Sequence, residues 1–238
     1  MNTFKLKTYE DRVLDRQIEE ACYEVNRSAK LGEAAYFSTL TAGGSVSYSG
    51  FEADGTLVMY GDATVWDDSM VPATSARTAA ADLALHNLVA GLYAPRVDLN
   101  DEVHQIVQFP HSIRTDSVVI KPHIHLINQA AIGAANYNVA FDLEWGWVNI
   151  GSAMSATTTT QSNIKASFQN APALSHKLVN FTDISAATGQ GGISSLFFCR
   201  AKRVSASTQA YDTNDIFWGG FDVHFEKNTV GSRTPTSK

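Results

Sequence analysis

Two histidines stand two residues apart in a strand-like run near the middle of the chain. They are His123 and His125 of the segment PHIH. A β-strand turns alternate side chains to opposite faces, so both imidazoles point the same way, roughly 7 Å apart by the strand rise. Such a pair can bind zinc if further ligands join it, because a zinc site takes three or four ligands from the protein. His104 and His111 are the candidates for a third ligand.

A structural role is the favoured interpretation of the same pair. Histidines on a half-buried strand face are more often hydrogen-bonded to neighbouring groups than bound to a metal. We therefore predict that His123 and His125 belong to a hydrogen-bonded scaffold. Metal binding by this pair is the alternative, and we expect no other cofactor.

Paired carboxylates offer a second kind of chemistry. Asp142 and Glu144 share one face of a strand-like run, and a glycosidase needs two carboxyl groups at a defined separation. Alternating acids on a strand are, however, far more typical of a solvated face. The acids Asp62, Asp67 and Asp68 lack the regular spacing of a calcium loop. With no nucleophile elbow and no phosphate loop in the chain, we expect that the protein is not an enzyme.

The elements that carry these residues read as antiparallel strands. Residues 138–148 alternate, with five apolar side chains on one face and Asp142, Glu144 and Gly146 on the other; the apolar set is Val139, Phe141, Leu143, Trp145 and Trp147. One buried and one wet face is typical of an antiparallel sheet that is covered on one side. We therefore predict that Trp145 and Trp147 are core residues.

The whole chain shows eight or nine such runs with turn signals between them and no alternation of strands with helices. This pattern predicts an all-β fold, an antiparallel β-sandwich of jelly-roll-like form, over residues 36–238. One segment, residues 74–90, has apolar spacing that suggests a helix.

An N-terminal α-helical arm is predicted for residues 1–35. Leu14, Ile18, Cys22 and Val25 recur at helical spacing and form one apolar stripe. A lone amphipathic helix beside a β domain must bury its stripe. Its partner is either the chain's own sheet or a neighbouring subunit, and the stripe is the candidate interface.

Charge and hydropathy exclude some partners. The net charge is −6, and residues 51–105 hold nine acids against two bases. Such a surface repels a phosphate backbone, so we expect no nucleic-acid partner. We expect no membrane partner either, because no run of about 18 apolar residues occurs. The first 25 residues lack the apolar centre of a secretory signal, which predicts folding in a cytoplasm.

Several motifs, taken in order, resemble a family of virion proteins of tailed bacteriophages. The match covers residues 57–238, and its most specific parts are the PHIH element and the ending in which DVH precedes GSR. The matching residues are 61–68, Pro72, Arg77, 109–112, 122–125, Trp145, Trp147, 221–225 and 231–233. The chain departs from the family pattern at Leu126, where we expect an aromatic residue.

The resemblance implies a β-sandwich protein of the phage particle rather than an enzyme. The expected role is a capsid decoration or cement protein on the outer shell, a homotrimer bound to the major capsid protein or other virion proteins. Closed trimers suit the local threefold positions of a shell. The expected location is the virion, assembled in the cytoplasm of the host bacterium. The alternatives are a tail, collar or fibre component that binds a host-surface glycan, and a carbohydrate-active enzyme built around Asp142 and Glu144.

Overall fold

The computed structural model describes residues 35–40, 46–51, 56–75, 83–133, 137–156, 158–187, 190–213 and 215–231. The predicted helical arm lies outside these residues, apart from Ala35, which begins the first strand. The four residues of its apolar stripe, Leu14, Ile18, Cys22 and Val25, also lie outside them. In the part of the chain that the structure describes, no helix is long and apolar enough to span a membrane.

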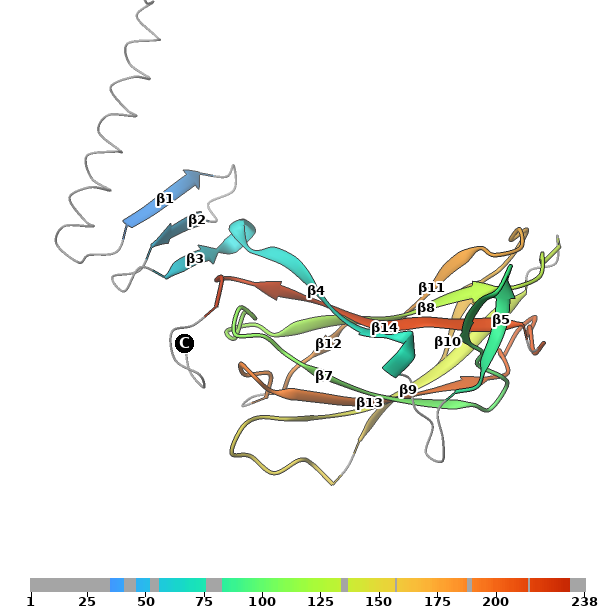
Figure 1. The fold of residues 1–238 in the computed structure, drawn as a ribbon. Coiled ribbons are helices and arrows are strands. Elements are labelled where there is room, and N and C mark those ends of the chain that lie inside the picture. The colour runs from blue at the N-terminus through green and yellow to red at the C-terminus, as the bar shows by residue number, and fades with distance from the viewer. Residues whose placement is uncertain are drawn as a thin grey trace, which may run out of the picture.

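Two antiparallel sheets face each other and form a β-sandwich (Figure 1). The first sheet has the order β11 (His176–Asn180), β8 (Val119–Asn128), β14 (Ile216–Lys227) and β4 (Val65–Pro72), and the short β12 (Ile184–Ser185) also pairs with β8. The second sheet has the order β10 (Thr159–Ser167), β9 (Asn138–Val148), β13 (Leu196–Val204) and β7 (Glu102–Gln108). The predicted all-β antiparallel sandwich is confirmed.

The winding of the eight strands β4, β7, β8, β9, β10, β11, β13 and β14 is that of a jelly roll. Counted along the chain, the first, third, sixth and eighth strands form the first sheet, while the second, fourth, fifth and seventh form the second. The first and last of them, β4 and β14, are neighbours. Eight strands wound in this way over two sheets form two Greek keys.

Apolar side chains from both inner faces fill the space between the sheets. On β14 the buried aromatics Trp218, Phe221 and Phe225 point inward. The Phe109 ring stacks on Trp147 at 5.0 Å and meets Phe225 edge-on at 5.8 Å. Trp147, only 4% exposed, is thus a core residue as predicted. Trp145 is partly buried and packs against this core.

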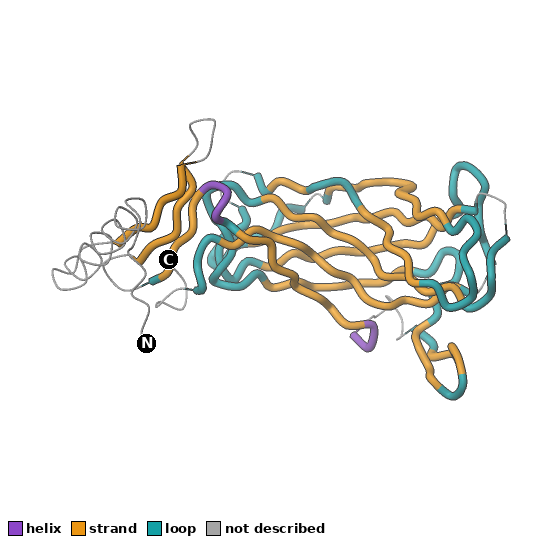
Figure 2. The backbone as a smooth tube through the Cα atoms, turned by 90° about the horizontal axis from the view of Figure 1, so that it is seen from above, coloured by secondary structure: helices purple, strands orange, loops and turns teal. Residues whose placement is uncertain are grey.

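A smaller sheet lies outside the sandwich. It joins β1 (Ala35–Leu40), β2 (Val46–Phe51) and β3 (Leu57–Tyr60), and a 3-10 turn at Gly61–Ala63 leads from it into β4. The Met59 amide donates a 2.7 Å hydrogen bond to the Asn228 carbonyl, which attaches β3 beyond the end of β14. Figure 2 shows this small sheet at one end of the elongated body.

The helix suggested for residues 74–90 is wrong for its C-terminal part. A 3-10 turn at Ala73–Ser75 follows β4, and β5 (Leu85–Val89) then pairs with β6 (Leu92–Pro95) in a hairpin. Its turn residues Ala90 and Gly91 both have positive φ, 46° and 82°. This is the geometry of a tight type I′ turn, whose twist matches that of the paired strands. The turn therefore decides the structure where the apolar spacing favoured a helix.

A buried arginine ties two loops to the sandwich. Arg203 on β13 is 1% exposed. Its guanidinium donates hydrogen bonds to the carbonyls of Val97, Tyr211 and Thr213 at 2.7, 2.8 and 2.9 Å. Burial lowers the pKa of this guanidinium, and the charges of nearby aspartates oppose that effect; they are Asp212, Asp98, Asp215 and Asp101. The buried guanidinium thus has hydrogen-bond acceptors inside the protein. Its hydrogen bonds hold the loops that precede β7 and β14.

We predict that Arg203→Leu lowers the free energy of unfolding by about 3–5 kcal/mol, because three carbonyls lose the buried donor that they share. Urea denaturation measures this difference. The matched control is Lys202→Leu on the opposite face of the same strand, where the side chain is 36% exposed and the expected change is below about 1 kcal/mol. Equal stability of the two variants would contradict the conclusion that Arg203 holds these two loops.

Candidate metal centre

Four histidines and two aspartates converge on the outer face of the first sheet. We call them the His/Asp cluster: His123 and His125 of β8, His176 of β11, Asp222 and His224 of β14, and Asp68 of β4. They come from four adjacent strands. Strand alternation turns their side chains away from the core. The alternate residues of β8 and β14 point into the core; they are Ile120, Ile124, Phe221 and Phe225.

Strand register places the members beside one another. Asp222 lies opposite His123, and His224 lies opposite Asp68. His125 lies opposite Leu178, which makes His176 its diagonal neighbour on β11. Directly opposite side chains of a sheet are within contact distance, and diagonal ones are within reach of long side chains. The cluster therefore follows from the pairing of the four strands.

The centre of the cluster is a compact triangle of possible ligand atoms. His123 Nε2 and His125 Nε2 are 3.1 Å apart. Asp222 Oδ2 lies 3.5 Å from His123 Nε2 and 3.7 Å from His125 Nε2. Two further imidazoles flank this triangle. His224 Nε2 lies 3.1 Å from Asp68 Oδ1 and 3.9 Å from Asp222 Oδ2.

The fourth imidazole, that of His176, hydrogen-bonds to His125 and stacks on its ring. His176 Nε2 lies 2.8 Å from His125 Nδ1, and the two rings stack with an interplanar angle of 9°. His125 thus has one ring nitrogen in the triangle and the other in a hydrogen bond. The His123 ring also hydrogen-bonds to the backbone of Lys121. Both rings are held in fixed orientations.

Burial lowers the pKa of the central imidazoles and so favours their neutral form. His123 and Asp222 are each 5% exposed. The pKa of His123 is lowered, first by desolvation and then by the neighbouring His125 and His224, against the opposing charge of Asp222. The pKa of His125 is lowered by desolvation and by His176. Neutral imidazole both hydrogen-bonds and binds metals, so the geometry allows both interpretations of the histidine pair.

The other residues considered as a third ligand lie elsewhere. His104 is on β7 in the second sheet, and His111 Nε2 lies 2.9 Å from Ser194 Oγ. The partners that sequence reasoning missed are Asp68, His176, Asp222 and His224. One signal for two of them was present in the chain: residues 221–225, FDVHF, repeat the alternation of an apolar face with a histidine-bearing face.

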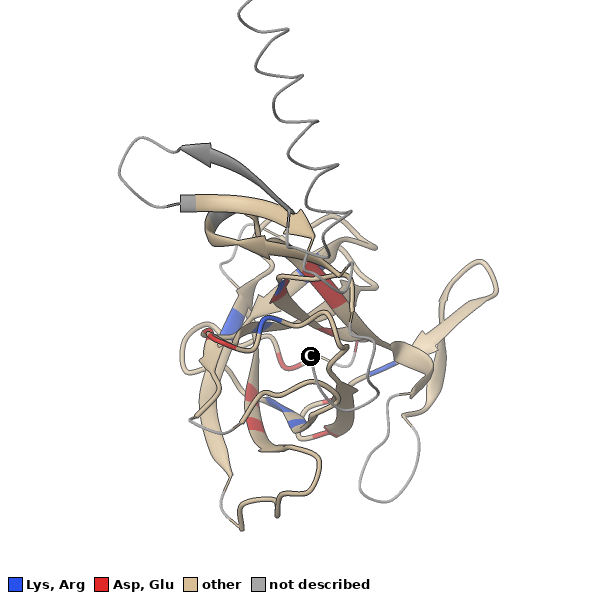
Figure 3. Ribbon diagram, turned by 90° about the vertical axis from the view of Figure 1, so that its left-hand side faces the viewer, with Lys and Arg blue, Asp and Glu red and all other residues tan. Residues whose placement is uncertain are grey.

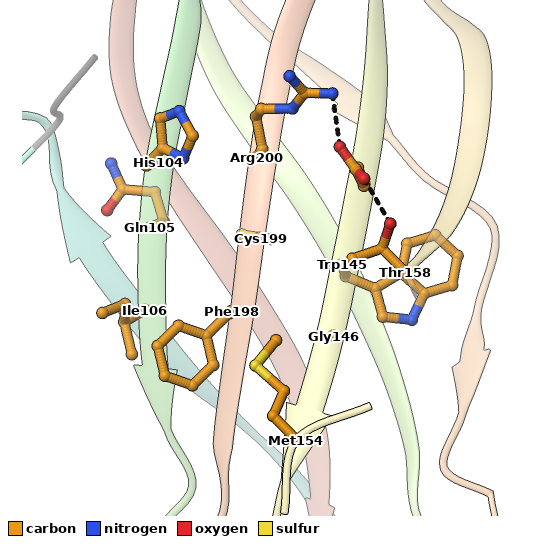
Figure 4. Close-up of a pocket in the computed structure, with 11 residues that line it drawn as sticks. His104, Gln105, Ile106, Trp145, Gly146, Met154, Thr158, Phe198, Cys199 and Arg200 are labelled. Atoms are coloured by element: carbon orange, nitrogen blue, oxygen red, sulfur yellow. Dashed lines mark hydrogen bonds and ion pairs between the residues drawn. The ribbon is translucent and has the colours of Figure 1, made fainter. Parts of the chain in front are cut away.

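A shallow groove on the outer face of the second sheet is a second candidate site (Figure 4). Its volume is about 500 Å³. Its apolar half holds Ile106, Phe198 and Met154, and Met154 lies close over Gly146, where a larger side chain would clash. The remaining lining residues are His104, Gln105, Glu144, Trp145, Thr158, Cys199 and Arg200.

A network of charges forms the other half of the groove. Arg200 Nη2 lies 2.5 Å from Glu144 Oε2, and Arg200 Nη1 lies 3.2 Å from Glu102 Oε2. The pKa of Glu144 is lowered, first by the hydrogen bond from the Thr158 hydroxyl and then by the charge of Arg200, although burial raises it. These contacts favour the ionised form of Glu144, whereas the general acid of glycoside hydrolysis is protonated.

The second carboxylate of the suggested enzyme pair has a structural contact. Asp142 Oδ1 accepts a 2.7 Å hydrogen bond from the Asn163 amide. Asn163 lies in an irregularity of β10 between Gln161 and Ile164, and its φ is 55°. Asp142 thus holds a β-bulge, a place where an extra residue leaves a backbone group to be satisfied by another partner.

Three solved structures resemble the chain distantly. No protein-family model and no curated protein matches the chain. The enzymatically active domain of tailspike protein 4 of bacteriophage CBA120 aligns with 69% of this chain and 19% of its own, at 7% identity and a TM-score of 0.25. TmCBM61 in complex with beta-1,4-galactotriose aligns over 69% and 85%, at 12% identity and a TM-score of 0.22. Eiger TNF from S. frugiperda aligns over 74% and 98%, at 9% identity and a TM-score of 0.25. Likenesses this weak do not bear on function.

We predict that His123→Ala lowers the free energy of unfolding by about 1–3 kcal/mol when a strong chelator is present, because buried partners lose their hydrogen bonds. Chemical denaturation in the chelator isolates this contribution from any metal. The control is His104→Ala on β7, outside the cluster and with its side chain 45% exposed, with little expected change. A variant as stable as wild type would show that the hydrogen-bonded histidine pair adds nothing to stability.

Proposed function

We propose that this chain is a structural component of a bacteriophage particle, placed on the capsid exterior as a trimeric decoration or cement protein. Its partners are further copies of itself and the major capsid protein. The order of motifs that resembles phage virion proteins supports this role. The cluster adds to it, because three of those motifs, residues 61–68, 122–125 and 221–225, contribute Asp68, the histidine pair and the Asp222–His224 pair to one place.

The β5–β6 hairpin is the observation that carries the assembly role. It projects from the sandwich in Figures 2 and 3, and its segment carries no Lys, Arg, Asp or Glu. Leu85, Leu92 and Tyr93 are 61%, 65% and 63% exposed. A two-stranded hairpin is marginal by itself in water, and a cluster of exposed apolar side chains marks an interaction surface.

A second copy of the chain is the proposed partner of this hairpin. An uncharged apolar strand pair fits an interface within a closed homotrimer better than a surface that stays in water. The stripe of Leu14, Ile18, Cys22 and Val25 remains the predicted second contact, with a neighbouring subunit or with the shell. The net charge of −6 suits a component that faces away from packaged DNA.

We predict that the triple variant Leu85→Ser, Leu92→Ser, Tyr93→Ser is a folded monomer, whereas the wild-type chain is a trimer, because the variant loses the apolar hairpin surface. Light scattering of the purified full chain measures the mass. The matched control, Val230→Ser, changes a side chain that is 70% exposed outside the hairpin and should remain trimeric.

The particle itself tests the placement. Quantitative mass spectrometry of purified virions should find the chain in hundreds of copies, and the triple variant should fail to join the particle. A few copies per virion would place the chain in the tail or collar instead. A wild-type monomer that is absent from virions would remove the proposed role altogether.

The groove favours a second candidate function, a tail, collar or fibre component that binds a host-surface glycan. A sugar ring presents apolar C–H faces and a rim of hydroxyl groups. The apolar half of the groove, around Phe198, suits the C–H faces of the ring. The Arg200–Glu144 pair beside it suits the hydroxyl groups. Sites of this kind combine an apolar lining with a few fixed polar groups.

For this candidate we predict that Phe198→Ala and Arg200→Met each weaken binding to the best glycan of a bacterial-surface array by about 10-fold or more, because they remove the packing face and the hydrogen-bond donor. Calorimetry measures the affinity. Ile150→Ala, a 58% exposed apolar residue outside the groove, should bind as wild type does. No glycan bound by the wild-type chain, or equal binding by both variants, would rule the groove out.

A further inference from the structure

The Asp222 carboxylate is buried without adequate partners. It is 5% exposed, and its Oδ1 has no hydrogen-bond partner. Its Oδ2 lies 3.5, 3.7 and 3.9 Å from three imidazole nitrogens, those of His123, His125 and His224. Direct N–H···O hydrogen bonds are about 2.7–3.2 Å long. A buried carboxylate needs a compensating charge or hydrogen bonds, and these contacts are too long to supply the bonds.

The same spacing suits ligands that share one ion. In a tetrahedral site with bonds of about 2.0–2.2 Å, two ligand atoms lie about 3.3–3.6 Å apart. The three sides of the triangle formed by His123 Nε2, His125 Nε2 and Asp222 Oδ2 measure 3.1, 3.5 and 3.7 Å. All three atoms thus fit around a single central cation with small adjustments.

The surroundings of the two histidines are those of metal ligands. A ligating histidine usually donates its second ring N–H to a carbonyl or another acceptor, which fixes the tautomer. His125 has this contact through Nδ1 to His176 Nε2 at 2.8 Å. His123 has a hydrogen bond with the backbone of Lys121. Because His123 Nε2 faces the triangle, Nδ1 is the ring nitrogen left for that bond.

We propose that His123, His125 and Asp222 bind one divalent transition-metal ion of the zinc type. Two imidazoles and one carboxylate favour zinc and its neighbours in the first transition row over calcium and magnesium, which prefer oxygen ligands. The ion compensates the Asp222 carboxylate and links the two central strands of the first sheet, β8 and β14.

One coordination position stays open in this site. Among the residues that the structure describes, no fourth histidine, cysteine or acid joins the three within 4.8 Å of all of them. The fourth ligand is a water molecule or a group outside the residues that the structure describes. His224, Asp68 and Asp222 form a second, more exposed set that shares Asp222 with the first. Asp68 adds one further negative charge beside the ion. His176 is a positioning residue that acts through His125.

Metal titration of the purified, tag-free full chain tests this proposal. The chain is first stripped with a chelator that is then removed, and Zn²⁺ is added while heat and bound metal are measured. The expected result is one ion per chain and a rise in melting temperature, since a ligand that binds only the native state stabilises it. Co²⁺ in the same site should give the intense visible absorption of four-coordinate cobalt.

Variants assign the ion to its ligands. Asp222→Asn keeps the shape of the side chain and should weaken Zn²⁺ binding by about 100-fold or more, as should His125→Gln. His176→Gln should weaken it by about 10–100-fold, the effect typical of a supporting residue. The matched control His104→Gln removes a histidine of β7 in the second sheet, outside the cluster and the hairpin, and should bind as wild type does.

Two results would overturn the proposal. The first is a stripped wild-type chain that takes up no Zn²⁺, Co²⁺ or Ni²⁺ at equimolar concentration, which would leave a purely hydrogen-bonded network. The second is uptake that persists at wild-type affinity in Asp222→Asn and His125→Gln, which would place the metal on other surface groups. His125 is partly exposed, with 22% of its side chain accessible, so its variant should remain folded even if Asp222→Asn does not.

Discussion

The register between β8 and β14 is the constraint on which the rest of this structure depends. These two central strands place Ile120 opposite Phe225 and Ile124 opposite Phe221, all four inside the core. A shift of one residue would turn these side chains to water, so burial fixes the register strongly. The same register leaves Asp222 opposite His123 on the outer face. The apolar core thus determines the geometry of a polar site that it does not touch.

Two buried charges show how the same fold treats polar groups differently. Arg203 lies in the interior, and three backbone carbonyls accept hydrogen bonds from its guanidinium. Asp222 is nearly as buried, yet one of its oxygens has no partner and the other meets imidazoles at 3.5 Å or more. A satisfied buried charge is part of the scaffold. An unsatisfied one, surrounded by metal-binding side chains, is the basis for the proposed metal site.

The outer surfaces divide the proposed roles between them. The first sheet carries the His/Asp cluster, the second carries the groove around Phe198 and Arg200, and the β5–β6 hairpin presents apolar side chains away from both. A jelly roll allows this division because its inner faces alone form the core. Assembly through the hairpin would leave both outer faces free for other contacts, which suits a protein of a particle surface.

The sequence by itself determined the all-β class, the alternation of β9 and the shared face of His123 and His125. Strand periodicity is local, because it depends only on residues that are close together along the chain. The sequence pattern misjudged residues 85–89, where the Ala90–Gly91 turn overrode a helical spacing. It also missed His176, Asp222, His224 and Asp68 as neighbours of the histidine pair. Only the tertiary structure brings these together, because their contacts join strands up to 156 residues apart along the chain (Asp68 and His224), and cross-strand pairing depends on the packing of the whole sandwich.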